Sequence, residues 1–331
     1  MGTVLQRDYL AVPGLRGAER IRQPIVKTHY LRSDLLFLLS ATIWGFAFVA
    51  QRMGMDHVGP YTYNGIRFFL GAIVLLPFIY RHRQQPVIAN KSVDAHRARS
   101  VIVYGGLAGL ALFSAASLQQ VGLIYTTAGK AGFITGLYVV IVPIMALLWR
   151  QRTNTGTWIG VLLAAVGMYF LSIKEDLTIG FGDLLQLIGA VIWATHIHLI
   201  GWMSPKTDAL TLAFTQFMTC ALASLLTAVA IESAGITDIL AAALPILYGG
   251  VLSVGVAYTL QVVAQRNAHP AHAAILLSLE SVFAALGGWL VLGETMTRRG
   301  MLGCLLMFGG MLVSQLYGFV VKGEPAAGSA Q

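Results

Sequence analysis

The segments DLLFLLSATIW at residues 34–44 and DLLQLIGAVIW at residues 183–193 decide the fold of this chain. Seven of their eleven positions are identical, and the alignment needs no gap. Two more pairs of segments follow in the same order, at offsets of 144 and 143 residues compared with 149 for the first pair. One pair opens with Tyr-Gly-Gly at Tyr104 and Tyr248, and the other carries glycines at 160 and 167 and at 303 and 310. Matches in register at three places indicate an internal duplication.

The hydrophobic content of the chain places both copies in a membrane. Of the 331 residues, 56% are apolar and only 11% are charged, with a mean hydropathy of +0.72, whereas about a quarter of the residues of a soluble domain are charged. The apolar residues form ten segments close to the roughly 20 residues that a membrane-spanning helix needs. These segments are residues 34–52, 62–80, 101–121, 130–149, 156–173, 183–202, 209–231, 244–264, 271–292 and 300–321. We therefore predict an all-α integral membrane protein with ten transmembrane helices.

The duplication predicts how these helices are arranged. Because each copy holds five helices, an odd number, the second copy crosses the membrane upside down relative to the first, which gives two inverted five-helix repeats. The predicted domains are a disordered basic tail at residues 1–33, a first repeat at 34–173, an inverted second repeat at 183–321 and a tail at 322–331.

The basic residues predict the side of the membrane on which the termini lie. Of the 22 Lys and Arg residues, 16 fall on the side of the two termini, and such an excess is typical of the cytoplasmic side. Residues 1–33 contain no apolar core of signal-peptide length, so we expect a cytoplasmic tail and no cleaved signal. The net charge of +8 then reflects membrane topology, and we expect no nucleic-acid partner.

The two cysteines, Cys220 and Cys304, lie in different spans and have no metal-type spacing. They are typical of small core residues and form no disulfide framework. We therefore expect no metal site and no cofactor.

Three segments carry a resemblance to a known family: WGFAFVAQR at residues 44–52, Arg67-Phe68-Phe69, and LSLESVFAALGGWLVLGE at residues 277–294, followed by Gly303. Over roughly residues 34–321, the chain resembles the ten-helix members of the drug/metabolite transporter superfamily, which are built from two EamA-type domains. The resemblance implies an exporter of amino acids, related metabolites or drugs in a bacterial inner membrane. The chain departs from the family where Glu-Pro is common in span nine, because Glu280 is followed here by Ser281.

Aromatic residues at equivalent places in the two repeats predict a binding site. Trp44 and Trp193 end the two matching segments, so we expect them to face each other across the axis that relates the repeats. Such a pair could hold an apolar or aromatic substrate, or an ammonium group through cation–π contact, and packing within the bundle is the equal alternative. Gln51 shares a helix face with Trp44, and His196 shares one with Trp193; for His196 alone, a structural role in the core is slightly favoured.

Small polar side chains in other spans complete the predicted pocket. Tyr138, Tyr258 and Gln261 are candidates for substrate contacts, and Ser114, Ser117 and Gln119 belong to the same polar set. Gln119 and Gln261 are repeat partners. The alternative is that these groups join helices to one another. Pro143 interrupts span four, and broken helices often lie beside such sites.

Two charged residues lie within spans. A carboxylate at the bilayer centre costs about 2.5–3.5 kcal/mol on insertion scales, so Glu280, near the middle of span nine, needs a partner, water or a proton. It either exchanges a proton during transport or, the favoured interpretation, ties span nine to a neighbouring helix. For Arg67, in the outer third of span two, we expect the long side chain to reach toward water; the alternatives are a gate residue that forms a salt bridge and a group that attracts a carboxylate.

These features favour a secondary transporter that moves a small molecule by alternating access. The chain has no GxxxxGK[ST] motif, which excludes ATP hydrolysis by this motif within the chain, so transport is driven by protons, by exchange or by a downhill gradient. The alternatives are a membrane-embedded enzyme, for which no nucleophile elbow, HExxH motif or carboxylate cluster is found, and a channel or scaffold. The expected partners are a small-molecule substrate and the lipid bilayer, and we expect a monomer or a weak homodimer.

Overall fold

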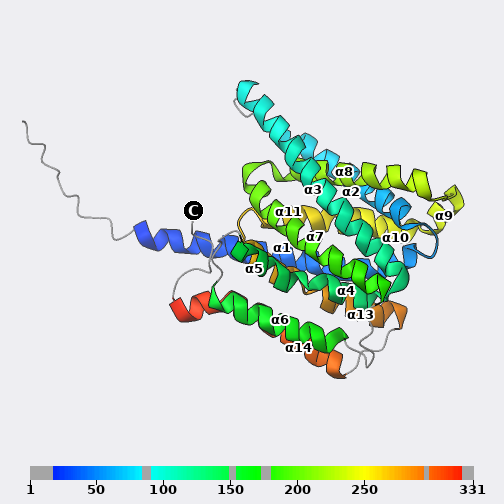
Figure 1. The fold of residues 1–331 in the computed structure, drawn as a ribbon. Coiled ribbons are helices and arrows are strands. Elements are labelled where there is room, and N and C mark those ends of the chain that lie inside the picture. The colour runs from blue at the N-terminus through cyan, green and yellow to red at the C-terminus, as the bar shows by residue number, and fades with distance from the viewer. Residues whose placement is uncertain (1–17, 84–90, 149–153, 173–179, 294–297, 323–331) are drawn as a thin grey trace, which may run out of the picture.

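The computed structural model describes residues 18–83, 91–148, 154–172, 180–293 and 298–322, and every regular element in these ranges is a helix. Figure 1 shows the helices running side by side in one bundle. Eight of the described segments are long and apolar enough to cross a membrane. The prediction of an all-α membrane protein is confirmed, and the count of ten spans is compatible with two further apolar helices, α6 and α14.

The first repeat contains five helical segments in the order that the sequence predicts. They are α1 (Ala18–Gly54), α2 (Pro60–Arg83), α3 (Lys91–Tyr125), the pair α4 (Ala128–Gly136) and α5 (Tyr138–Leu148), and α6 (Thr155–Ser172). Helix α1 begins at Ala18 and so includes residues that we expected in the N-terminal tail; residues 1–17 lie outside the described residues.

The second repeat has the same plan with two short additions. It contains α7 (Phe181–Met203), α8 (Ala209–Ile231), α10 (Ala243–Leu247) continuing through a π-helix (Tyr248–Tyr258) into α11 (Thr259–Ala264), the pair α12 (Pro270–Leu277) and α13 (Glu280–Leu292), and α14 (Arg298–Lys322). The additions are α9 (Ile236–Ala241), which precedes α10, and a 3-10 helix (Ser204–Lys206) between α7 and α8. The tail predicted at 322–331 lies, beyond Lys322, outside the described part of the chain.

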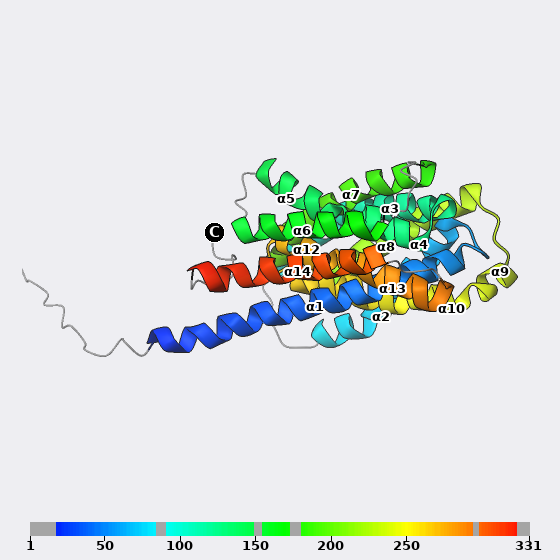
Figure 2. The same cartoon turned by 90° about the horizontal axis from the view of Figure 1, so that it is seen from below.

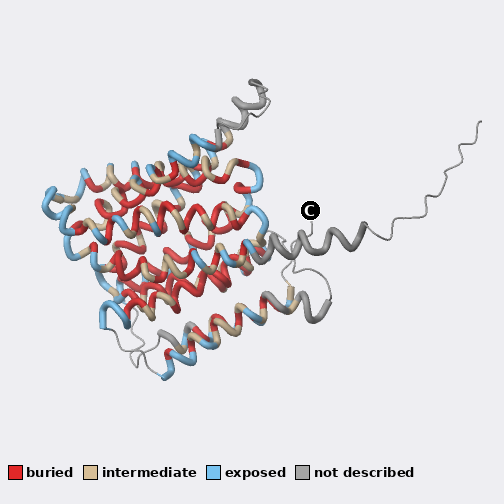
Figure 3. Tube along the Cα trace, turned by 180° about the vertical axis from the view of Figure 1, so that it is seen from behind, coloured by how far each residue is buried: buried red, intermediate tan, exposed pale blue. Residues whose placement is uncertain are grey.

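The two repeats are interleaved and do not form separate lobes. Helix α1 packs on α13 and on the π-helix, α2 packs on α8, and α3 packs on α7 and α8. Figure 3 shows the buried residues concentrated in the middle of this assembly. Large apolar side chains such as Leu226 and Val229 are instead 73% and 87% exposed, as expected where a helix faces lipid. The core therefore lies at the interface between the repeats.

Helices α6 and α14 lie beside each other at the edge of the bundle (Figures 1 and 2). Their contact uses the glycines that identified the duplication. A Cβ atom on Gly160 would lie 2.7 Å from the Gly310 carbonyl oxygen, and one on Gly167 would lie 2.6 Å from that of Gly303. Side chains larger than hydrogen would separate the two backbones, so the repeated glycines determine this helix pair.

Two spans are broken at equivalent positions. Helix α4 ends at Gly136 and α5 begins at Tyr138, while α12 ends at Leu277 and α13 begins at Glu280. We predicted the break in span four at Pro143, which instead lies inside α5. A proline ring collides with the carbonyl of the residue four positions earlier, which is Val139, so the distortion falls on the N-terminal side of Pro143.

Candidate functional site

A buried cavity of about 30 Å³ lies between the two repeats, close to both helix breaks. It is lined by eight of the nine residues that the sequence singles out: Trp44, Gln51, Arg67, Tyr138, Trp193, Tyr258, Gln261 and Glu280. His196 is the exception. The structure thus brings together side chains from α1, α2, α5, α7, the π-helix, α11 and α13, and their roles in binding stay predictions.

The cavity has six further lining residues: Phe48, Gln119, Thr135, Ile197, Ser253 and Leu277. Helical spacing could have identified two of them, because Phe48 and Ile197 each follow one of the two tryptophans by four residues. Gln119 was in the predicted polar set. Ser253 has no comparable signal, since it belongs to the π-helix; π-helices are rare and lie frequently at functional sites.

An aromatic cluster forms one wall of the cavity. The ring centroid of Tyr258 lies 4.5 Å from that of Trp44 and 6.0 Å from that of Trp193, with which it is stacked. Tyr258 thus contacts both tryptophans that we expected to face each other. Trp44 donates its indole N–H to the Ser253 carbonyl at 3.2 Å, whereas the Trp193 indole N–H has no partner. Of the two tryptophans, only Trp193 has an indole N–H available to a ligand.

Five polar atoms of cavity-lining residues are buried without a hydrogen-bond partner. They are Gln51 Oε1, the Tyr138 hydroxyl, Trp193 Nε1, Gln261 Oε1 and Glu280 Oε1. Buried polar atoms are nearly always paired, and leaving one unpaired costs about 1–3 kcal/mol. Five such atoms around one cavity indicate a place where a polar ligand or water binds.

Glu280 is the first residue of α13 and only 5% exposed. Its carboxyl group lies beside the Tyr138 hydroxyl, yet neither that hydroxyl nor Glu280 Oε1 has a partner of acceptable geometry. The bond that ties this helix to its neighbour comes from the next residue, because Ser281 Oγ donates to the Gly132 carbonyl at 2.7 Å. Gly45 of α1 packs against the backbone at Glu280, where a Cβ would lie 2.7 Å from the carbonyl oxygen. The helix is thus held by Ser281 and Gly45, which leaves the Glu280 carboxyl group directed at the cavity.

Arg67 does not reach toward water, and our expectation for its side chain was wrong. Arg67 is 2% exposed, and its Nε donates a hydrogen bond to Asn64 Oδ1 at 3.0 Å. The guanidinium carbon lies 4.9 Å from the Phe68 ring centroid and 5.4 Å from that of Tyr63. Sequence position gives the depth of a residue along a helix but not the face on which it lies, and this face of α2 points into the bundle. No ion pair of Arg67 is found among the described residues, and its role as a gate or a charge anchor stays a prediction.

The two histidines of α7 are held by structural contacts. His196 is fully buried and its Nε2 lies 2.9 Å from Gln216 Oε1, and His198 Nε2 lies 2.9 Å from the Val142 carbonyl. Within the described ranges, no group of three or more His, Cys, Asp or Glu side chains could hold a metal ion. The His196 ring contacts that of Trp193, with 5.9 Å between the ring centroids, and does not itself line the cavity.

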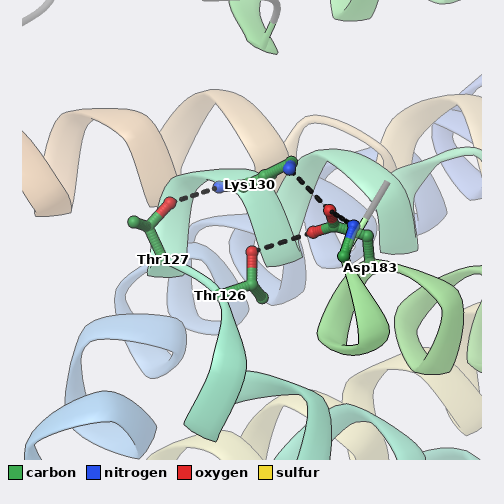
Figure 4. A network of polar contacts seen from close by, with 5 residues as sticks. Thr126, Thr127, Lys130 and Asp183 are labelled. Carbon is green, nitrogen blue, oxygen red and sulfur yellow. Dashed lines mark hydrogen bonds and ion pairs between the residues drawn. The ribbon is translucent and has the colours of Figure 1, made fainter. Parts of the chain in front are cut away.

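Equivalent polar contacts of an aspartate join the repeats at the two ends of the bundle. At one end, Asp183 near the start of α7 pairs with Lys130 of α4 and accepts a hydrogen bond from Thr126 at 3.0 Å (Figure 4). At the other, Asp34 of α1 lies 2.8 Å from His272 of α12. Asp34 and Asp183 are the first residues of the two matching segments. Lys130 and His272 are each the third residue of their helix.

Comparison with known proteins agrees with this architecture. The model of the EamA-like transporter family matches residues 31–173 and again residues 180–315. An uncharacterized transporter of Archaeoglobus fulgidus is 32% identical over 91% of this chain and 89% of its own length. The uncharacterized transporter YoaV of Bacillus subtilis is 23% identical over 85% of this chain and 96% of its own length. The uncharacterized inner membrane transporter YedA of Escherichia coli K12 is 24% identical over 77% of this chain and 81% of its own length.

The fold also matches a solved crystal structure. The superposition has a TM-score of 0.66 at 19% sequence identity and covers 88% of this chain and 98% of the other. At this identity the match concerns the fold alone.

Proposed function

Because the chain belongs to the EamA-like transporter family, we propose that it is a secondary transporter that exports small organic metabolites by alternating access. The metabolite classes that the resemblance implies are amino acids, related compounds and drugs. The observation that carries the proposal is the cavity between the repeats, around which five buried polar atoms have no partner.

The size of the cavity supports a carrier with a closed state. A water molecule needs about 10–15 Å³ of such volume, so 30 Å³ admits water and excludes an amino acid. A larger solute enters only when the helices around the cavity separate. Transport then requires a second conformation of the bundle, which is the property that distinguishes a carrier from a channel.

The positions of the helix breaks support such a motion. The breaks of spans four and nine place Tyr138 and Glu280 at the cavity. Discontinuous helices at the interface of inverted repeats are a recurrent feature of substrate sites in secondary transporters. Half-helices on either side of a break can tilt separately, so each end of the cavity can open without unfolding a span.

The location and coupling of the transporter follow from the same features. We place it in a bacterial inner membrane with both termini in the cytoplasm, on the charge asymmetry of the sequence and on the relative YedA, whose name places that protein in the inner membrane. We assign proton coupling to Glu280, because this residue is only 5% exposed and its Oε1 has no hydrogen-bond partner.

Uptake into proteoliposomes tests the proposal. The purified chain is reconstituted and offered a panel of labelled amino acids and cationic dyes, with and without a pH gradient, beside protein-free liposomes. We expect saturable uptake of at least one panel member, at the low turnover of a carrier. If no member moves above the protein-free control under either condition, the proposal fails. Glu280→Gln tests coupling, since gradient-driven transport that persists unchanged excludes Glu280 as the proton carrier.

A further inference from the structure

The two contacts that join the repeats at the ends of the bundle use the same acid and different bases. Asp34 Oδ1 lies 2.8 Å from His272 Nε2 at one end, and Asp183 pairs with Lys130 at the other. The two bases occupy equivalent places, since each is the third residue of its helix. Histidine is the side chain that ordinarily gains or loses its charge between about pH 5 and 8, whereas lysine keeps its charge over that range. The duplicated contact therefore contains a titrating base in only one of its two copies.

Three histidines lie together at the end of the bundle that holds this titrating base. His269, the residue before α12, is close enough to His198 and His272 for their charges to repel one another. Its Nδ1 accepts a hydrogen bond from the backbone N–H of Ala271 at 3.3 Å. Burial, followed by the two neighbouring histidines, lowers the pKa of His269. His198 Nε2 lies 2.9 Å from the Val142 carbonyl. Of the three, only His272 faces a carboxylate, which stabilises its protonated form.

The surroundings of His272 contain one acid. The helices packed on α12 are α1, α5, α6, α7 and α14. Helix α1 brings Asp34 and α7 brings His198, while α5 and α6 carry no charged residue and α14 carries none between its first two residues and its last. The basic residues nearest along the chain, Arg32 and Arg266, are exposed. In the stretches that the structure describes, the recorded partner of the Asp34 carboxylate is His272 alone, so the charge of His272 decides whether this contact is ionic.

We propose that the contact between Asp34 and His272 is a pH-sensitive closure of the cytoplasmic end of the bundle. This inference rests on the proposed function, because it adds a regulation to one step of alternating access. When His272 is protonated, opposite charges hold α12 against α1 and this end stays closed. When His272 is neutral, Nε2–H can still donate to Asp34, but the ionic attraction is lost and the end opens more readily. The side chains are 22% and 20% exposed, so solvent protons reach them.

Distances between pairs of spin labels, measured by pulsed EPR, report the opening of each end without any substrate. The labels are attached at exposed positions of a full chain in detergent whose two native cysteines are replaced by alanine: Leu35→Cys with Asn267→Cys at the cytoplasmic end, and Leu184→Cys with Tyr125→Cys at the other. From about pH 5.5 to about pH 8.5, the fraction of molecules with the longer distance should rise about two- to fivefold at the cytoplasmic end, the range for a partly exposed ion pair. The other end should not respond. No response at the cytoplasmic end, or an equal response at both ends, overturns the inference.

Exchanging the two bases assigns the response to its residue. His272→Lys should make the cytoplasmic end independent of pH, and Lys130→His should make the other end pH-dependent. Both variants keep a base opposite the aspartate, and thermal unfolding checks that they are folded. A response that persists in folded His272→Lys contradicts the proposal. His269→Asn is the matched control, because asparagine also caps a helix; it should keep the full response, and loss of the response there would assign the titration to His269 and overturn the proposal.

Uptake into proteoliposomes with the same pH on both sides separates this inference from the proposed function. Saturable uptake with the same pH dependence in the unmodified chain and in His272→Lys overturns the pH-sensitive closure and leaves the transporter standing. Absence of uptake for the whole panel removes the proposed function, and the spin-label distances then decide on the closure alone.

Discussion

At the scale of single residues, the two equivalent tryptophans have different hydrogen-bond environments. The indole N–H of Trp44 is bonded to the Ser253 carbonyl, and that of Trp193 is buried without a partner. A duplicated position thus contributes to stability in one repeat and is available to a ligand in the other. Sequence alignment makes the pair visible but does not reveal this difference, because the acceptor is a backbone carbonyl of the π-helix.

Substitution by phenylalanine should therefore lower stability at Trp44 and substrate affinity at Trp193. Trp44→Phe loses a hydrogen bond and should lower the free energy of unfolding by about 0.5–1.5 kcal/mol. Trp193→Phe removes a donor that binds nothing in the protein, so stability should change little while substrate affinity falls about 5–10-fold, the equivalent of about 1 kcal/mol. Unfolding in detergent and calorimetric binding measure the two quantities. Identical behaviour of the two variants would contradict the distinction.

The hydroxyl of Ser281 donates the buried hydrogen bond to the Gly132 carbonyl of α4. Interhelical bonds of this kind in membrane proteins contribute about 0.6 kcal/mol on average and up to about 1.7, so Ser281→Ala should destabilise the chain by that order. Ser114→Ala is the matched control, because the Ser114 hydroxyl bonds only to Leu110 of its own helix. If both changes shift the unfolding midpoint equally, the bond between α13 and α4 contributes nothing specific.

At the scale of helices, the pair α6 and α14 depends on glycines that allow close backbone contact. A Cβ on Gly310 would lie 2.6 Å from the Gly160 carbonyl oxygen, whereas one on the adjacent Gly309 meets nothing within 4 Å. Gly310→Ala should cost about 1–3 kcal/mol by overpacking, and Gly309→Ala should be neutral or stabilising by up to about 1 kcal/mol through helix propensity. Thermal unfolding of the two variants measures the difference. Equal stability would show that α6 and α14 do not approach this closely.

The sequence predicts most of the fold, because its strongest signals are periodic. The apolar segments, the matching Asp34–Trp44 and Asp183–Trp193 segments and the repeated glycines together gave an all-helical membrane protein with inverted repeats. The location of the break in span four was less predictable, since Pro143 acts on the turn before it. The burial of Arg67 was missed because depth along a helix says nothing about which face meets a neighbour. Of the side chains that line the cavity, Trp44, Trp193, Gln119 and Gln261 were predictable from repeat partners, whereas Ser253 of the π-helix was not.

At the scale of the whole molecule, equivalent polar contacts between the repeats lie at the two ends of the bundle, and the cavity between them is small. Asp34 pairs with His272 at one end, and Asp183 pairs with Lys130 at the other. Because the second repeat is inverted, equivalent positions lie on opposite sides of the membrane. In the proposed alternating-access cycle, the two contacts close opposite sides of the bundle. Opening one side then requires one pair to separate while the other stays formed.

Breaking one pair should favour opening on its own side of the membrane. The reporter is Ser253→Cys in the cavity of a chain carrying Cys220→Ala and Cys304→Ala, labelled by a membrane-impermeant thiol reagent in right-side-out and inverted vesicles. With the termini in the cytoplasm, Lys130→Gln should accelerate labelling from outside and Asp34→Asn should accelerate it from the cytoplasmic side. A contact worth about 1 kcal/mol predicts a change of about fivefold in the labelling rate.

The control is Arg52→Gln, which breaks the exposed pair of Arg52 with Asp56 within a single chain segment and should change neither rate. Acceleration from the same side by Lys130→Gln and Asp34→Asn would show that the two pairs do not close opposite ends, and so would contradict alternating access through this cavity.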